Sequence, residues 1–448
     1  MDKKLTVEET AKKLKVSTKT ILREIKKGNL EIERIGRRIL ISEKTLVNYL
    51  HESRGTVTKN LENFINSRKS EMVDLLQKMV SLPSVGYTQN GEYELAKFVY
   101  RKLQDFGIRC VFLKEGSSVA VRASFGYANK GFLINSPLDT APVGNLDNWT
   151  YPPFAGVVKA GKMYGRGVAD CKAGIVAAIY TLLALKSIYP EEMMRVELVF
   201  DGGEQDGTYD GMRMVLKRGL HADCAIIGYA GDEFDLAIGC RGYHRYTFKT
   251  KGKSAHTGAR YNHGINAIRL MVDFIKEMYV YDFPKSKNKY FPFGQKITFS
   301  VIEGGSVINV VPDECTSRLD VRITPDYSKS YVDGVIADII KKLKSKDTNF
   351  LLSRKYDVGN EGYVISDKEK IVAVTNKAIS FVYSRKARLV ASGPAHIGAL
   401  LYGIGVPSVV WGPRGGNVHS YNEYIEIDSL PATVQIYSLA ILNYFGVK

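Results

Sequence analysis

Basic side chains are concentrated at the start of the chain, and the chemistry they suggest is contact with phosphate groups. Residues 1–70 hold 17 Lys and Arg against 9 Asp and Glu. Less than a sixth of the 448 residues therefore carries half of the net charge of +16. Neutralising backbone phosphates is the general way in which proteins bind nucleic acids. The distribution favours a nucleic-acid contact for this segment, with a merely solvated basic arm as the alternative.

Capping signals predict the helices that would present these basic side chains. Thr6 and Glu9 have the spacing of a capping box, which starts one short helix. Ser17 follows a tight turn and caps a second short helix, which Gly28 ends. The sequence therefore predicts two short helices joined by a tight turn.

The residues after the second helix complete a pattern. Residues 30–41 alternate around Gly36 as a hairpin does, and Ser42 caps a last short helix that runs to about His51. Two short helices followed by a wing are typical of a winged helix-turn-helix. Residues 5–50 resemble excisionase/MerR-type DNA-binding domains over nearly their full length.

That resemblance implies which side chains would meet DNA. The second helix would lie in the major groove and the wing beside the phosphates or the minor groove. The residues so placed are Thr18, Lys19, Thr20 and Arg23 on the helix and Arg37 and Arg38 at the wing. The alternative is a small protein-interaction module with a solvated basic face. We assign residues 1–52 to this domain and residues 53–62 to a polar linker.

The remainder of the chain has the pattern of an α/β protein. Short apolar strands alternate with helical periods from residue 63 onward, and residues 172–188 form an apolar helix that we expect to be buried. The pattern changes over residues 239–350, which predict an inserted α+β domain. The larger α/β domain is then expected to comprise residues 63–238 and 351–448.

Composition indicates a folded protein. Hydrophobic residues make up 45% and charged residues 25%, which excludes wholesale disorder. We find no apolar run of the roughly 20 residues needed to span a bilayer, and no signal peptide at the start. The five cysteines are scattered and never form a CxxC pair, which is typical of reduced thiols. We therefore expect a cytoplasmic protein without a membrane partner.

Nine short segments after residue 63 occur in the order and spacing of one known family. They are PLDTAP, NWTYPPF, YGRGVADCKAG, GEQDG, GKSAHTG, GINAI, GGSVINVVPD, DVR and GPRGGNVHSYNEYIEI. Residues 63–448 resemble the zinc-dependent aminoacylase, carboxypeptidase and succinyl-diaminopimelate desuccinylase family of metallohydrolases. The resemblance implies a metallopeptidase-like α/β fold, in which the inserted domain serves as a lid and pairs two chains into a homodimer.

The resemblance also implies a set of catalytic positions. In this family two metal ions hold a bridging water, and a nearby glutamate moves its proton. Asp170 matches the aspartate that bridges both metals, and His419 matches the C-terminal histidine ligand. Glu204 matches the glutamate that acts as general base.

Three other ligand positions depart from the family pattern. Pro137 stands where the first histidine is expected, so Asp139, which would orient that histidine, has lost its partner. Gln205 replaces an anionic ligand with a neutral amide, and Tyr229 replaces a later carboxylate. Two-metal hydrolysis is therefore not expected.

The sequence still allows a weaker metal site. Asp170, Gln205 and His419 would hold zinc or another divalent ion loosely as a single site. Other side chains that would compensate for the lost ligands are Cys171, Asp232, Glu233 and His396. Each of these four is interpreted as an ordinary structural or surface residue in preference to a ligand.

The sequence matches the family's substrate-binding positions more closely than its metal-ligand positions. Asn309 and Arg322 match residues that hold the substrate's carboxylate in the family, a role that suits a guanidinium without any metal. His256 matches a histidine that the inserted domain offers across the dimer interface as an oxyanion stabiliser. The alternatives are that Arg322 pairs with a neighbouring acid on its sheet and that His256 is a plain surface residue.

Three hypotheses follow. The first is a DNA-binding regulator whose sensor is a hydrolase fold with a degenerate metal site and a small amino-acid-like carboxylate as ligand. The second is an active metal-dependent hydrolase of N-acyl amino acids or small peptides, whose helix-turn-helix is only a tether. The third is a structural or interaction protein. We prefer the first, because function depends on site residues more than on fold.

Overall fold

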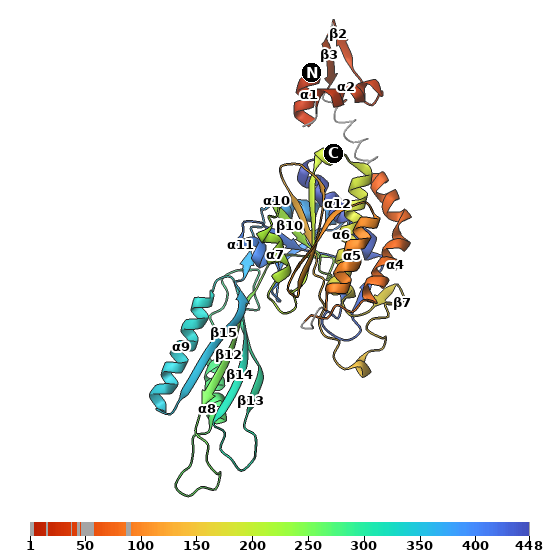
Figure 1. Ribbon diagram of the computed structural model, residues 1–448. Coiled ribbons are helices and arrows are strands. Elements are labelled where there is room, and N and C mark those ends of the chain that lie inside the picture. The colour runs from red at the N-terminus through yellow and green to blue at the C-terminus, as the bar shows by residue number, and fades with distance from the viewer. Residues whose placement is uncertain are drawn as a thin grey trace.

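The computed structural model describes residues 4–14, 17–36, 38–42, 45, 58–86 and 91–447. These residues form a small N-terminal domain, a large domain built around a mixed sheet, and an elongated inserted domain (Figure 1). The architecture confirms the predicted α/β class with an N-terminal winged helix-turn-helix.

The small domain has the predicted two helices and hairpin, with one additional strand. Its described elements are β1 (Lys4–Thr6), α1 (Val7–Leu14), α2 (Thr18–Lys26), β2 (Glu33–Ile35) and β3 (Arg38–Ser42). The strand order is β1-β3-β2, so the chain start adds a third strand to the predicted hairpin. The core is formed by Leu5, Ala11, Ile21, Leu30 and Ile41.

Side-chain caps set the helix boundaries of the small domain. The Thr6 N–H donates to Glu9 Oε2 at 2.8 Å, and the Glu9 N–H donates to Thr6 Oγ1 at 3.2 Å, which is the predicted capping box. Ser17 Oγ accepts the N–H of Thr20 at 3.1 Å at the start of α2. The predicted last helix lies outside the described residues except for Ser42 and Thr45. Of the predicted linker, residues 53–57 lie outside them, whereas residues 58–62 are helical, so the linker prediction is wrong for its second half.

The large domain is organised by a sheet that has nine strands among the described residues. Its order is β16-β11-β18-β10-β6-β9-β5-β4, with β17 paired to β11, and β18, β10, β6 and β9 run parallel. The strands are β4 (Arg109–Glu115), β5 (Ser118–Gly126), β6 (Phe132–Asn135), β9 (Arg195–Asp201), β10 (Cys224–Ile227), β11 (Asp235–Cys240), β16 (Tyr363–Val364), β17 (Arg388–Ser392) and β18 (Ser408–Val410).

Helices cover this sheet and divide its core in two. One cluster takes side chains from α4 (Lys69–Val80), α5 (Tyr93–Asp105), α6 (Ala173–Ile188), α10 (Lys370–Tyr383) and α12 (Ser429–Phe445). The other takes them from α7 (Asp210–Lys217) and α11 (Gly398–Gly403). One described helix, Val168–Ile188, is long and apolar enough to cross a membrane, but 94% of its most apolar window is buried inside the protein. It is the core helix predicted from the sequence.

The inserted domain is a four-stranded antiparallel sheet packed against two helices, in the order β13-β14-β12-β15. Its elements are β12 (Gly242–Lys251), α8 (Ala267–Val280), β13 (Lys296–Gly304), β14 (Glu314–Ile323), α9 (Lys329–Lys346) and β15 (Leu351–Asn360). A second, small sheet of the large domain contains β7 (Val157–Lys159), β8 (Lys162–Tyr164), β19 (Gly415–Gly416) and β20 (Tyr424–Glu426).

The predicted boundaries of the insertion, residues 239–350, need correction. β11 continues to Cys240 within the large sheet, so the insertion starts about two residues later than expected. β15 pairs antiparallel with β12 along its length, so the chain returns to the large sheet only after Asn360. Strand pairing between distant residues decides both boundaries, and local pattern does not reveal it.

Candidate functional site

The carboxyl ends of parallel strands bring several predicted site residues to one edge of the large sheet. Asp139 follows β6, Glu204 and Gln205 follow β9, and Tyr229 follows β10. Asp170 lies in the irregular turn Val168–Lys172 that leads into α6. Ligand sites of open α/β sheets form at this edge, so the fold places these residues where chemistry is expected.

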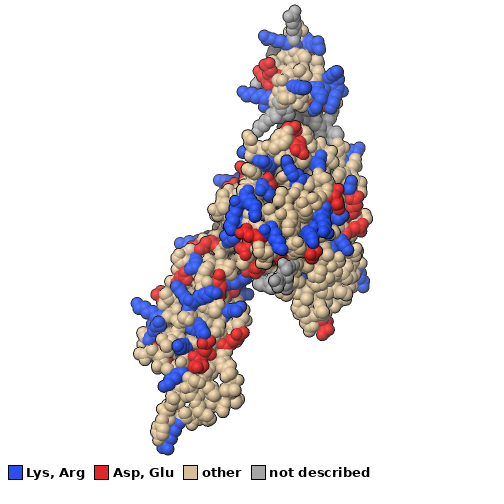
Figure 2. Space-filling view, viewed as in Figure 1, with Lys and Arg blue, Asp and Glu red and all other residues tan. Residues whose placement is uncertain are grey.

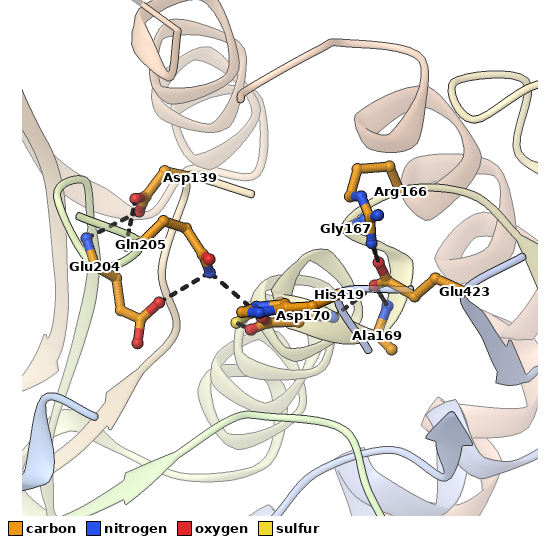
Figure 3. Close-up of polar contacts among 10 residues, drawn as sticks. Asp139, Arg166, Gly167, Ala169, Asp170, Glu204, Gln205, His419 and Glu423 are labelled. Carbon is orange, nitrogen blue, oxygen red and sulfur yellow. Dashed lines mark hydrogen bonds and ion pairs between the residues drawn. The ribbon is translucent and has the colours of Figure 1, made fainter. Parts of the chain in front are cut away.

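Asp170 is the centre of a polar network (Figure 3). His419 Nε2 donates to Asp170 Oδ2 at 2.7 Å, and Gln205 Nε2 lies 3.3 Å from the same oxygen. Gln205 Nε2 also donates to Glu204 Oε2 at 2.9 Å. The predicted metal residues Asp170, Gln205 and His419 therefore lie together with Glu204. The side-chain amide joins the two carboxylates.

Asp139 is buried and holds the loop that carries two of these residues. Its Oδ1 accepts the backbone N–H of Glu204 at 3.2 Å, and its Oδ2 accepts that of Gln205 at 2.8 Å. The side chain is 1% exposed. Asp139 thus fixes the backbone of the loop, a role that the sequence did not reveal.

Glu423 and Arg166 were missed by the sequence analysis. Glu423 accepts Arg166 Nη1 at 2.6 Å and the N–H groups of Gly167, Ala169 and Asp170 at 3.1, 2.9 and 3.0 Å. Both charged side chains are buried, and each neutralises the charge of the other. The pair fixes the backbone that presents Asp170. In the sequence, the feature that could have pointed to this pair is Glu423, an acid four residues after His419 in the same segment.

Burial shifts the protonation of the acids at this edge. It raises the pKa of Asp139 to about 8. Burial, reinforced by the charge of Asp170, raises the pKa of Glu204 well above its usual value. The hydrogen bond to Asp170 raises the pKa of His419, so this pair favours an imidazolium beside a carboxylate. Hydrogen bonds between its own side chains then hold the network together.

One prediction concerns the pH dependence of stability. Burial raises the pKa of Asp201 to about 7; its Oδ1 accepts Asn135 Nδ2 at 2.5 Å, and its Oδ2 has no partner among the described residues. The folded state therefore keeps a proton that the unfolded chain loses above about pH 4. This stabilisation is complete at low pH and disappears as pH rises through about 7.

We therefore expect the melting temperature to fall by several degrees between about pH 5 and pH 8, and Asp201→Asn to reduce that slope. Asparagine keeps the oxygen that accepts from Asn135 and cannot ionise. Differential scanning calorimetry across a buffer series measures both proteins. The exposed Asp105→Asn should retain the wild-type slope. An Asp201→Asn protein with an unchanged slope would contradict the assignment.

The four side chains considered as replacement ligands have other roles. Cys171 Sγ donates to Asp170 Oδ1, and Glu233 accepts Arg414 Nη1 at 2.7 Å. Asp232 accepts the N–H of Phe234 at 2.8 Å, which is a turn contact. His396 is buried against the Tyr229 ring, 6.1 Å between centroids, and burial lowers its pKa to about 3.

The predicted substrate-binding residues are not brought together within one chain. Arg322 donates from Nε and Nη2 to Asp320 at 2.6 and 3.2 Å, which is the neighbouring-acid pairing considered as an alternative. Asn309 lies beyond the opposite end of β14, so about 25 Å of strand separates the two. His256 is exposed in the loop that pairs with this segment, where Thr257 N–H donates to Asn309 O at 3.0 Å.

Arginines that the sequence analysis missed surround Arg322. Arg245 Nε donates to Asp320 Oδ2 at 3.1 Å, and its Nη1 donates to the carbonyl of Asp206, beside Glu204 and Gln205, at 2.8 Å. Burial, together with the charge of Arg322, lowers the pKa of Arg241. In the sequence, Arg241 and Arg245 could have been found from the segment CRGYHR at the start of the insertion, which contains both. Positive charge therefore gathers between the inserted domain and the Glu204 loop.

The predicted DNA-contacting side chains lie on one helix surface and the wing. Thr18, Lys19 and Arg23 are exposed on α2, whereas Thr20 is half-buried with its hydroxyl 2.9 Å from Ser17 Oγ. Arg38 is exposed at the start of β3, and Arg37 lies outside the described residues. Figure 2 shows basic side chains projecting from both sides of the small domain. Leu22, which the sequence analysis did not select, is 47% exposed on α2.

Comparison with known proteins yields two family matches. A model described as Peptidase family M20/M25/M40 matches residues 133–443, and one described as a helix-turn-helix domain matches residues 5–54. A probable succinyl-diaminopimelate desuccinylase from Staphylococcus aureus is 25% identical over 417 residues, covering 85% of this chain and 99% of the relative. An uncharacterized metallohydrolase from Methanocaldococcus jannaschii is 28% identical over 410 residues, covering 82% and 98%.

Solved structures share the fold of most of this chain. An M20 family metallo-carboxypeptidase from Sulfolobus solfataricus has a TM-score of 0.70 at 18% identity, covering 84% of this chain and 99% of that one. Human carnosine dipeptidase 1 has a TM-score of 0.69 at 16% identity, covering 87% and 100%. At these identities the likeness extends to the fold alone.

Proposed function

Because this chain belongs to peptidase family M20/M25/M40 and begins with a helix-turn-helix domain, we propose that it is a DNA-binding regulator whose hydrolase fold senses a small carboxylate. The helix-turn-helix would read DNA, and the hydrolase fold would bind the ligand without hydrolysing it. The ligand class we propose is an amino-acid-like molecule.

The chemistry of the donor set at Asp170 carries this proposal. In the family pattern Asp170 and its neighbouring carboxylates face cations, whereas here Asp170 faces the hydrogen-bond donors Gln205, His419 and Cys171. Pro137 offers no ligand, and Tyr229 puts a phenol where a carboxylate is expected. Within the described ranges, no group of three or more His, Cys, Asp or Glu side chains is arranged to hold a metal ion. The residues present do not fit a two-metal centre.

The arginines beside the Glu204 loop support a carboxylate ligand. Arg241, Arg245 and Arg322 lie around Asp320, so a ligand carboxylate at this place would meet several guanidinium groups. The name of the Staphylococcus aureus relative favours the same class, since a succinyl-diaminopimelate is an amino acid carrying further carboxylates. Asn309 and His256 of the distal loops would reach this ligand only from a second chain.

Exposed apolar residues on the inserted domain support such a homodimer. Val272, Tyr279 and Val280 on α8 are 49, 55 and 71% exposed, and Ile302 on β13 is 52% exposed. Pairing through this surface would join two helix-turn-helix domains, which suits half-sites separated by about one helical turn or a multiple of it. The five free cysteines fit a reducing compartment, and we propose the cytoplasm.

An active hydrolase is the second candidate function. Glu204 keeps the position of the general base, and the curated relatives carry the names of hydrolases. In that case Asp170, His419 and a side-chain oxygen of Gln205 would have to hold one metal ion, and the helix-turn-helix would serve another purpose.

A mobility-shift assay with the full-length protein tests the proposed function. We expect selective retention of a few fragments from a sheared genomic library at both 50 and 200 mM salt, because base contacts persist when phosphate contacts are screened. Binding to all fragments at low salt and none at high salt would contradict sequence-specific regulation. Adding N-succinyl or N-acetyl amino acids should change the affinity for the selected fragments.

A further inference from the structure

A groove lies between α10 and α12 on the large domain. Its cavity volume is about 680 Å³, and its described lining also includes Thr58, at which the described chain resumes after residue 45. The walls come from one side of each helix: Ala373, Lys377 and Phe381 on α10, and Leu439 and Asn443 on α12. The size is within the range of small-molecule sites.

The walls of the groove are mainly apolar and accessible. Phe381 is 59% exposed, and Leu439 and Val447 are partly exposed beside it. A surface of this kind favours an apolar chain lying along the groove, because contact removes carbon surface from water on both partners.

The charged side chains that line the groove, among the described residues, are all basic. Lys377 and Lys386 line it, and none of its described lining residues is an acid. Neither lysine forms an ion pair with a residue that the structure describes. The side chain of Asn376 exchanges two hydrogen bonds of 3.0 Å with the backbone of Ala387, which holds the backbone next to Lys386. The groove therefore presents two ammonium groups that have no acidic partner among the described residues.

We propose that this groove binds an amphipathic carboxylate, an acyl chain of medium length whose carboxylate pairs with Lys377 and Lys386. Apolar walls take the chain, and the two lysines take the head group. The site is separate from the Asp170 network and from the arginines around Asp320, so it does not depend on the proposed sensing of an amino-acid-like ligand.

A ligand in the groove would also touch the helical segment that begins at Thr58. Residues 58–67 are helical, and Leu61 and Ile65 are buried in the core that α12 also enters. Gln435 on α12 donates to Glu62 at 3.1 Å. A ligand beside Thr58 therefore contacts both α12 and the helix through which the chain continues toward the small domain.

Isothermal titration of the full-length protein with decanoate tests the proposal. We expect saturable binding of one decanoate per chain, with decanol at least tenfold weaker and acetate without measurable heat. Decanol lacks the charge and acetate lacks the chain, so the two controls separate the contributions of the lysines and of the apolar walls.

Variants locate the binding in the groove. Lys377→Gln/Lys386→Gln should weaken decanoate about tenfold while leaving decanol unchanged, because one charge-assisted contact is worth roughly a factor of ten. Phe381→Ser should weaken both ligands. Lys368→Gln removes the same charge from an exposed position outside the groove and should bind decanoate as the wild type does.

Two results would overturn the proposal. Equal affinity for decanoate and decanol would make the groove a non-selective apolar surface. Absence of decanoate binding, together with self-association that Phe381→Ser abolishes in light scattering, would make it an interface between copies of this chain.

Discussion

Changing Gln205 to glutamate is expected to give the protein a zinc site that is far tighter than any in the wild type. The variant would place three anionic or imidazole ligands, Asp170, Glu at position 205 and His419, around one point, which is the family's second metal site. After dialysis against zinc and gel filtration, we expect about one zinc per chain by elemental analysis for Gln205→Glu and far less than one for the wild type.

The stability of the Gln205→Glu variant should also depend on zinc. In the wild type the Gln205 amide hydrogen-bonds to the carboxylates of Asp170 and Glu204. Gln205→Glu replaces that donor by a third acid, which should destabilise the metal-free protein by about 3 kcal/mol. Saturating zinc should restore the melting temperature of the variant and leave that of the wild type unchanged. Gln104→Glu, an exposed change of the same type, should show no zinc dependence.

Stoichiometric zinc in the wild type would contradict this account. If such a protein also hydrolysed N-acyl amino acids or dipeptides, and Glu204→Ala abolished the activity, the active-hydrolase function would replace the regulator. A panel of N-succinyl, N-acetyl and dipeptide substrates, assayed with and without added zinc, makes the comparison.

Loss of DNA selectivity is the second large effect, expected when Arg23 is removed from α2. Arg23 and Lys19 lie one helical turn apart and are both exposed, so a helix in the major groove would point both at base edges. Arg23→Ala should weaken binding to a selected fragment by about 10- to 100-fold and relax sequence preference, because one base contact is worth about 1–3 kcal/mol.

Arg38 at the wing provides a contrasting variant. If Arg38 contacts phosphate, Arg38→Ala should weaken binding uniformly across sequences and reduce the salt slope by about one. Lys341→Ala removes an exposed charge from α9 in the inserted domain and serves as the matched control. Fluorescence anisotropy over a salt series measures all three. Unchanged binding in Arg23→Ala and Arg38→Ala would favour the protein-interaction module.

Local signals predicted the small domain well, because its helix boundaries depend on residues three apart. The Thr6–Glu9 box and the Ser17 cap are interactions within one turn, and both are present. The added strand β1 was missed because it depends on pairing with β3, more than thirty residues away. The same reason explains why β15 was assigned to the wrong domain.

The candidate site was predicted in part. Motif positions identified Asp170, Glu204, Gln205 and His419, and the fold brings these residues together. A motif does not say where a side chain points, so the pairing of Arg322 with Asp320 was not decided by sequence. The buried Glu423–Arg166 pair joins two distant segments, and no local pattern reveals such a contact.

The contacts of Asp139 bear on whether the family's histidine could be placed at position 137 without cost. Its carboxylate now accepts two backbone N–H groups of the Glu204 loop. A histidine placed at position 137 would compete with that loop for Asp139, so a substitution that adds one ligand would loosen the residues beside it. Both effects act through the same side chain. The effects of Pro137→His and of substitutions in the Glu204 loop are therefore expected not to add.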